Sequence, residues 1–169
     1  LGMVFQQFNL FNNERFRRMA EFPSRCYVGG GYTVSFADSH PHFSTPPSVL
    51  WNCGRAFGSQ ELKDLAILRL SDGDSFQYPH SVTVEVYRSI FYLKYAAQMR
   101  ADVDHANAMV KNSSMQETLK KLRSSSAVST WYPETQFCFL RGAGEWFLGA
   151  KAGFNNESHN HNDVGNFVL

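Results

Sequence analysis

Two histidines separated by a single residue, His159 and His161, are the part of the sequence best suited to chemistry. In an extended backbone, side chains two positions apart emerge on the same face, about 6.6 Å apart along the strand, so both imidazoles would face one space. Neutral imidazole is a common metal ligand and exchanges protons readily near neutral pH. Asp163, two residues further on, has a carboxylate that can orient a histidine ring or bind a metal itself. The spacing predicts a metal site or a proton-transfer site.

The same stretch also fits an ordinary turn. Asn160, Asn162 and Asp163 surround the histidines, and such side chains hydrogen-bond to their own backbone and tolerate unusual dihedral angles. A bare pair of histidines two positions apart is not specific for a metal site. Residues 164–169 read as a strand that enters a core, and Gly165 permits a close approach of backbones. Spacing alone leaves the turn and the functional site open.

Residues 158–167, Ser-His-Asn-His-Asn-Asp-Val-Gly-Asn-Phe, closely resemble a motif of the heparinase II/III-like polysaccharide lyases. In that family a Ser-His-Asn-His-Asn-Asp-hydrophobic-Gly-Ser-Phe block opens the β-sandwich domain. Asn166 stands where the family usually has serine. The segments 131–134, 139–141 and 146–153 are similar to the first strands of that domain. The resemblance is strong over residues 128–169 and diffuse before them.

The resemblance implies a multidomain α+β protein of which this chain is a segment. Residues 1–126 would be the C-terminal helices of an incomplete (α/α) toroid, and residues 127–169 the first strands of an antiparallel β-sandwich. The apolar pattern agrees, because its spacing is helical before residue 124 and changes to alternation afterward. Three consecutive serines at 124–126 are the predicted linker.

The resemblance also assigns roles to individual residues. In the family the first histidine of the block faces a cleft between toroid and sandwich, and the second binds a structural zinc ion. Carried over, His159 is the catalytic residue, Asn160 beside it binds substrate, and His161 is the zinc ligand. The other zinc ligands and the catalytic tyrosine are expected outside this segment. Asp38 and His40 lie in a loop similar to one that lines the family's cleft, which predicts substrate binding; loop capping by Asp38 is the alternative.

The function implied is β-elimination in a uronic-acid-containing glycan, such as heparin or a related glycosaminoglycan. The expected partners are this acidic polysaccharide and the rest of the parent chain, in the periplasm or outside the cell. Two alternatives remain open. One is a non-catalytic carbohydrate-binding or structural module that keeps a histidine-bound metal. The other is a metal-dependent hydrolase in which His159 and His161 activate water.

Composition limits the other possibilities. The net charge of +1 gives no general footprint for nucleic acid. No apolar run approaches the roughly 20 residues that span a bilayer, so membrane insertion is not expected. The three cysteines are widely spaced, which predicts free, buried thiols. Arg141 and Lys151 fall in predicted strands, where they could meet an acidic glycan or simply form solvated strand edges.

The expected elements follow from spacing and caps. Residues 3–21 should be helical, with Asn13 as an N-cap and Pro23 as the stop, followed by a long loop to Pro47 with a short strand at 32–36. From Pro46 we expect a helix capped by Thr45 and ended by Gly58, with a buried stripe of Val49, Leu50, Cys53 and Phe57. A second helix should follow Ser59 and reach Leu70, with Leu62, Leu65, Ala66 and Arg69 on one side. Helices are also expected over residues 81–100 and 102–123, and strands over 128–131, 136–141 and 146–152.

Overall fold

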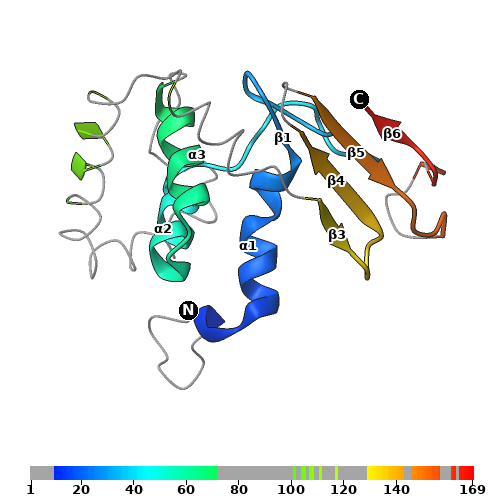
Figure 1. Cartoon of the computed structure of the whole chain (residues 1–169), viewed down its shortest axis with the longest axis horizontal. Helices are drawn as coiled ribbons and strands as arrows, with labels where there is room; N and C mark the ends of the chain where they lie inside the picture. The colour runs from blue at the N-terminus through cyan, green and yellow to red at the C-terminus, as the bar shows by residue number, and fades with distance from the viewer. Residues whose placement is uncertain are drawn as a thin grey trace, which may run out of the picture.

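The computed structural model describes residues 10–71, 129–142, 146–156, 161–162 and 164–169, and isolated helical positions between 101 and 117. Helices and two antiparallel sheets make up this part of the chain, which is therefore a mixed α+β fold. Figure 1 shows helix α1 between the α2–α3 pair and the larger sheet. None of the described helices is both long and apolar enough to cross a bilayer. The predicted helix 81–100 and the serine linker lie outside the described residues.

Helix α1 (Glu14–Cys26) follows a short 3-10 turn, η2 (Leu10–Asn12). The predicted cap is confirmed, because the Asn13 side chain accepts hydrogen bonds from two first-turn N–H groups at 2.9 and 3.2 Å. The predicted stop at Pro23 is wrong, since the helix runs on to Cys26. Proline removes one N–H from the helix, but the Pro23 carbonyl still accepts from the N–H of Tyr27 beyond the helix, so the last turn is hydrogen-bonded after it.

A small hairpin follows α1 directly. It pairs β1 (Tyr27–Gly29) with β2 (Tyr32–Thr33), so the strand predicted at 32–36 is confined to its first two residues. The long loop predicted from Pro23 to Pro47 is likewise shorter, because the end of α1 and this hairpin occupy its first part. Residues 34–46 remain as the irregular connection to α2, and we call them the 34–46 loop.

Helices α2 (Pro47–Phe57) and α3 (Gln60–Ser71) form the other side of the molecule. The predicted end of α2 is confirmed, because Gly58 adopts a left-handed conformation with φ 65°. The predicted cap is wrong: Pro46 holds the N-cap position, without a side-chain hydrogen bond. In α3 the side predicted to be buried is buried, Leu62 and Leu65 being fully inaccessible.

The predicted buried face of α2 is shifted. Leu50 is buried as expected, but its buried neighbours are Trp51 and Gly54, whereas the other members of the predicted stripe are half-buried. The reason is the close approach of α3. A Cβ on Gly54 would lie 2.8 Å from Cγ of Lys63, so only glycine lets the two helices pack at this position.

The larger sheet contains β3 (Thr130–Tyr132), β4 (Phe137–Arg141), β5 (Phe147–Lys151) and β6 (Phe167–Val168), in that order and all antiparallel. The first three agree with the predicted strands to within two residues, because alternating apolar positions define them clearly. The strand predicted over residues 164–169 is paired only at Phe167 and Val168. Whether these strands belong to a sandwich stays a prediction.

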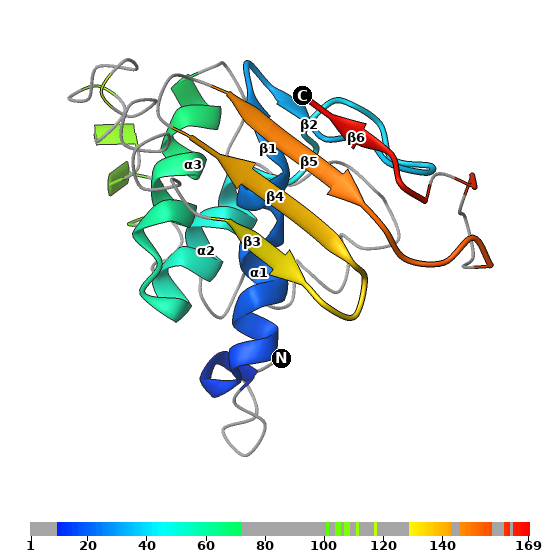
Figure 2. The same cartoon turned by 45° about the vertical axis from the view of Figure 1, so that its right-hand side comes forward.

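The larger sheet packs on α1, as Figure 2 shows. Phe139 and Phe147 of the sheet form a buried cluster with Cys26 at the end of α1 and Val34 after the hairpin. Phe22 meets Phe139 edge to face, with ring centroids 5.8 Å apart. The strands therefore share a core with a helix assigned to the other predicted domain. The boundary at 126/127 stays a prediction, since the residues around it are outside the described part.

Arg141 fixes the end of α1 against the sheet. Its Nη2 group donates to the carbonyl oxygens of Ser24 at 3.2 Å and Arg25 at 3.4 Å, and also to that of Tyr27. The Ser24 and Arg25 carbonyls belong to the negative end of the helix dipole, where a cation is stabilising, and the Tyr27 carbonyl belongs to β1. Burial lowers the pKa of Arg141, while the carboxylate of Glu61 opposes this. The prediction that Arg141 meets a glycan or lies at a solvated edge is therefore wrong.

We expect Arg141→Met to lower the free energy of unfolding by about 2 to 3 kcal/mol, because several carbonyl groups lose a charged donor. Arg18→Met is the matched control, since Arg18 donates from an exposed position to a single carbonyl, that of Trp131, at 2.7 Å. It should cost less than about 1 kcal/mol. Urea unfolding followed by circular dichroism measures both values. Equal losses for the two variants would contradict the role given to Arg141.

Candidate functional site

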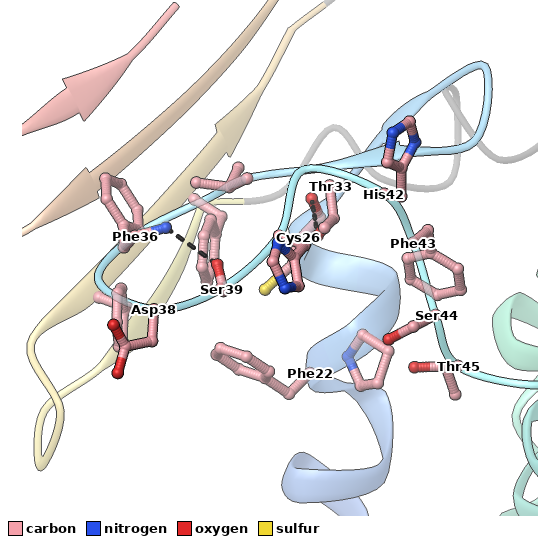
Figure 3. A pocket seen from close by; sticks show the side chains of 15 residues that line it. Phe22, Cys26, Thr33, Phe36, Asp38, Ser39, His42, Phe43, Ser44 and Thr45 are labelled. Carbon is pink, nitrogen blue, oxygen red and sulfur yellow. Dashed lines mark hydrogen bonds between the residues drawn. The ribbon is translucent and has the colours of Figure 1, made fainter. Parts of the chain in front are cut away.

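A pocket of about 530 Å³ lies between α1, the 34–46 loop and the sheet. Its floor is apolar and aromatic, and Figure 3 shows the ring of Phe22 and the sulfur of Cys26 at this floor. Its rim is polar and comes mostly from the loop: Thr33, Asp38, Ser39, His40, His42, Ser44 and Thr45. The pocket therefore joins a surface for apolar groups to a row of hydrogen-bonding groups.

A tight turn in the loop presents Asp38. The backbone N–H of Ser39 donates to the carbonyl of Phe36 at 3.2 Å, and the N–H of Phe36 donates to the Ser39 hydroxyl at 3.1 Å (Figure 3). The Ser35 hydroxyl closes the turn from the other side with a 2.5 Å bond to the Ser39 carbonyl. Ala37 adopts φ 52°, which is uncommon for a residue with a Cβ. The backbone geometry of this turn therefore sets the position of the Asp38 side chain.

The carboxylate of Asp38 contacts the imidazole of His161. Oδ1 of Asp38 lies 2.5 Å from Nε2 of His161, although the two residues are far apart in the sequence. Their side chains are 50% and 60% exposed, so the pair stabilises the fold by no more than about 1 kcal/mol. The contact therefore adds little to the stability of the fold, and its main effect is to hold the two side chains next to each other.

A second turn supports His161. Asn162 has φ 57° and Gly165 has φ 84°, so the chain reverses between the histidine and β6. The N–H of Gly165 donates to the carbonyl of Lys151 at 2.8 Å, which attaches this turn to the end of β5. The location of His161 beside the loop thus follows from the pairing of β6 with β5.

The structure brings three of the five residues predicted for the site to one region. Asp38 and His161 are in contact, and His40 is exposed at the pocket rim. His159 and Asn160 lie outside the described residues, as does Asp163. The catalytic role of His159, the substrate contact of Asn160 and the shared face of the two histidines stay predictions.

The residues fit a zinc site in part. Among the described residues there is no group of three histidine, cysteine or acidic side chains that could hold a metal. His161 and Asp38 instead have the arrangement of one imidazole ligand and the carboxylate that orients it. Further ligands would come from outside the described part, as the resemblance implies, and zinc stays a prediction.

One feature of the pocket, the location of Cys26, and one of the adjoining sheet, the burial of Lys151, could not be read from the sequence. All three cysteines are free as predicted, but only Cys26 is buried, whereas Cys53 and Cys138 are half-buried. The location of Cys26 at a pocket depends on strand β4, much later in the chain. The only local signal is its spacing from Phe22, one helical turn earlier. Lys151 is 4% exposed, with Nζ 6.0 Å from the ring centroid of Phe137, so it is neither a solvated edge residue nor exposed to a glycan.

Comparison with known proteins gives no further information on the site: no protein-family profile and no curated protein matches this chain. The histidine motif and the geometry of the pocket are therefore the features that bear on function.

We expect Cys26 to resist alkylation in the folded chain. Burial raises the pKa of its thiol from 9.0 to about 12, although the Arg141 guanidinium opposes the shift. The thiolate fraction then falls about 1000-fold, and the greater nucleophilicity of a more basic thiolate leaves a net slowing of roughly 50-fold. Iodoacetamide labelling read by mass spectrometry, with Cys138 as the internal comparison, measures it. Equal rates at Cys26 in folded and urea-unfolded chains would contradict this burial.

The same shift makes stability depend on pH. The thiol of Cys26 holds its proton more tightly in the folded chain than in the unfolded chain. Its contribution to the free energy of unfolding is therefore complete below pH 9 and is lost as the pH rises toward about 12. Cys26→Ala should flatten this loss, which denaturant unfolding at several alkaline pH values would show. A loss of the same size in Cys26→Ala would assign the effect to other groups.

Proposed function

We propose that this chain is a segment of a polysaccharide lyase that cleaves uronic-acid-containing glycans, such as heparin or heparan sulfate, by β-elimination. The observation that carries the proposal is the contact between Asp38 and His161. It joins the loop that resembles a cleft wall to the histidine block that resembles the lyase motif. Two segments linked to one function by resemblance alone are thus in contact, at a residue, Asp38, that lies on the pocket rim.

The reaction requires three things of the site. It must neutralise the carboxylate of the sugar, remove the weakly acidic proton next to it, and give a proton to the departing glycosidic oxygen. His159 is the proposed proton-transfer group, because imidazole can act in either direction near neutral pH. Asn160 and His40 are proposed to hold substrate through hydrogen bonds. A catalytic tyrosine is expected elsewhere in the parent chain.

The pocket suits part of a sugar chain. Pyranose rings have polar edges and apolar faces, and the pocket has a polar rim above an aromatic floor. Arg141 and Lys151 make their contacts inside the protein. An acidic substrate would therefore be met by the rim histidines, His40 and His42, and by groups outside the described residues.

His161 would hold the zinc ion together with ligands from outside the described part. When bound, zinc would stabilise the histidine block as a structural ion, and the proton transfers belong to the side chains of the chain itself. Location in the periplasm or outside the cell is part of the same proposal.

In the full-length protein, we expect His159→Ala to keep the metal and the melting temperature and to lower turnover by roughly 10²- to 10⁴-fold, the range for a positioned proton-transfer group. His161→Ala should instead lose metal and lower the melting temperature. Metal content and thermal unfolding are measured beside the ultraviolet absorbance of the unsaturated uronide product.

Two results would change this assignment. If His159→Ala lost the metal while His161→Ala kept it, the roles of the histidines would be reversed. If the wild-type protein bound zinc and an acidic glycan but formed no unsaturated product, the non-catalytic carbohydrate-binding module would replace the lyase.

A further inference from the structure

We propose that Asp38 is a positioning residue that holds the ring of His161 in the tautomer with hydrogen on Nε2, and not a residue that binds substrate. The inference rests on the proposed function for the use of His161 as a metal ligand. The orientation of the ring does not depend on catalysis. It gives Asp38 a role different from the one predicted from the sequence.

The chemistry of the contact sets the tautomer. An ionised carboxylate is an acceptor only, so the hydrogen between Oδ1 of Asp38 and Nε2 of His161 must be on the nitrogen. In a neutral imidazole the other nitrogen, Nδ1, then has the free electron pair. A carboxylate that accepts from one ring nitrogen also makes the other a stronger ligand. The 2.5 Å contact therefore prepares Nδ1 for a metal or a proton.

The distance argues against a metal held between the two side chains. Zinc lies about 2.0 to 2.2 Å from nitrogen and oxygen ligands, and tetrahedral geometry then separates two ligand atoms by about 3.3 to 3.6 Å. Nε2 and Oδ1 are closer than this, at 2.5 Å. The two atoms are in direct contact, closer than two ligands of one metal ion, so Asp38 acts through His161.

The turn that presents Asp38 is consistent with this role. Its hydrogen bonds to Ser39 fix the backbone on both sides of the carboxylate, and Ala37 adopts an unfavourable left-handed conformation within it. Strained backbone of this kind is typical of functional sites. Because both members of the pair are at least half exposed, the turn is not explained by burial of a charged pair.

The test compares Asp38→Ala, Asp38→Glu and the control Asp64→Ala in the full-length protein. Asp64 is also an aspartate that accepts a side-chain hydrogen bond, from Gln60 at 2.9 Å on the surface of α3. Nitrogen-15 NMR of histidine-labelled protein in mildly alkaline buffer reads the tautomer of His161 directly. A titration with Zn²⁺ in a metal buffer measures affinity, and thermal unfolding checks the fold.

We expect wild-type His161 to show hydrogen on Nε2, and Asp38→Ala to give a mixture of tautomers with an unchanged melting temperature. Zinc affinity should fall by about 10- to 100-fold, and Asp38→Glu should restore part of it. Asp64→Ala should match the wild type. The inference is overturned if Asp38→Ala leaves the tautomer unchanged, or if Asp64→Ala alters it equally.

The outcome is separate from that of the proposed function. If no unsaturated product forms but the tautomer changes as expected, the lyase proposal fails and the positioning role of Asp38 stands. If Asp38→Ala raises KM for the uronan while the His161 tautomer stays as it was, Asp38 binds substrate and the positioning role is wrong.

Discussion

The described fold depends on a partly buried cation, Arg141, at the end of helix α1. In the last turn of α1, the carbonyls of Ser24 and Arg25 accept hydrogen bonds from the Arg141 guanidinium, which supplies donors that the helix itself lacks at its end. Because Arg141 is the last residue of strand β4, these hydrogen bonds hold the sheet against the last turn of α1. The same guanidinium lies 4.7 Å from the ring centroid of Phe147. The Arg141 side chain thus fixes helix α1, the hairpin and the sheet relative to one another. A separate ion pair, between Arg25 and Glu61 at 3.0 Å, links α1 to α3.

The pocket is a consequence of this arrangement. The N–H of Val34 donates to the carbonyl of Cys26 at 2.9 Å, so the chain leaves the hairpin along the end of α1. The N–H of Phe43 donates to the carbonyl of Gly31 at 2.8 Å, and this hydrogen bond holds the other end of the 34–46 loop against the hairpin. Between these two points the loop can only pass beside the sheet. Its turn then lies close enough to the start of β6 for Asp38 to reach His161.

Local signals in the sequence predicted the local structure well. The Asn13 cap and the left-handed Gly58 each depend on one residue and its neighbours, and strand alternation depends on a short window. Features that depend on distant segments were missed. The buried face of α2 follows from the approach of α3 at Gly54, and the structural use of Arg141 follows from where α1 ends. The resemblance predicted Asp38 and His161 as site residues, but their mutual contact could be seen only in the folded chain.

The contact between the 34–46 loop and the histidine block joins the two parts of the proposed site, and NMR tests this contact directly. In a sample with specifically labelled histidine and aspartate, we predict nuclear Overhauser effects between the ring protons of His161 and the β-protons of Asp38. Sharp His161 ring signals that show no such effect, together with contacts from that ring to another part of the chain, would contradict it.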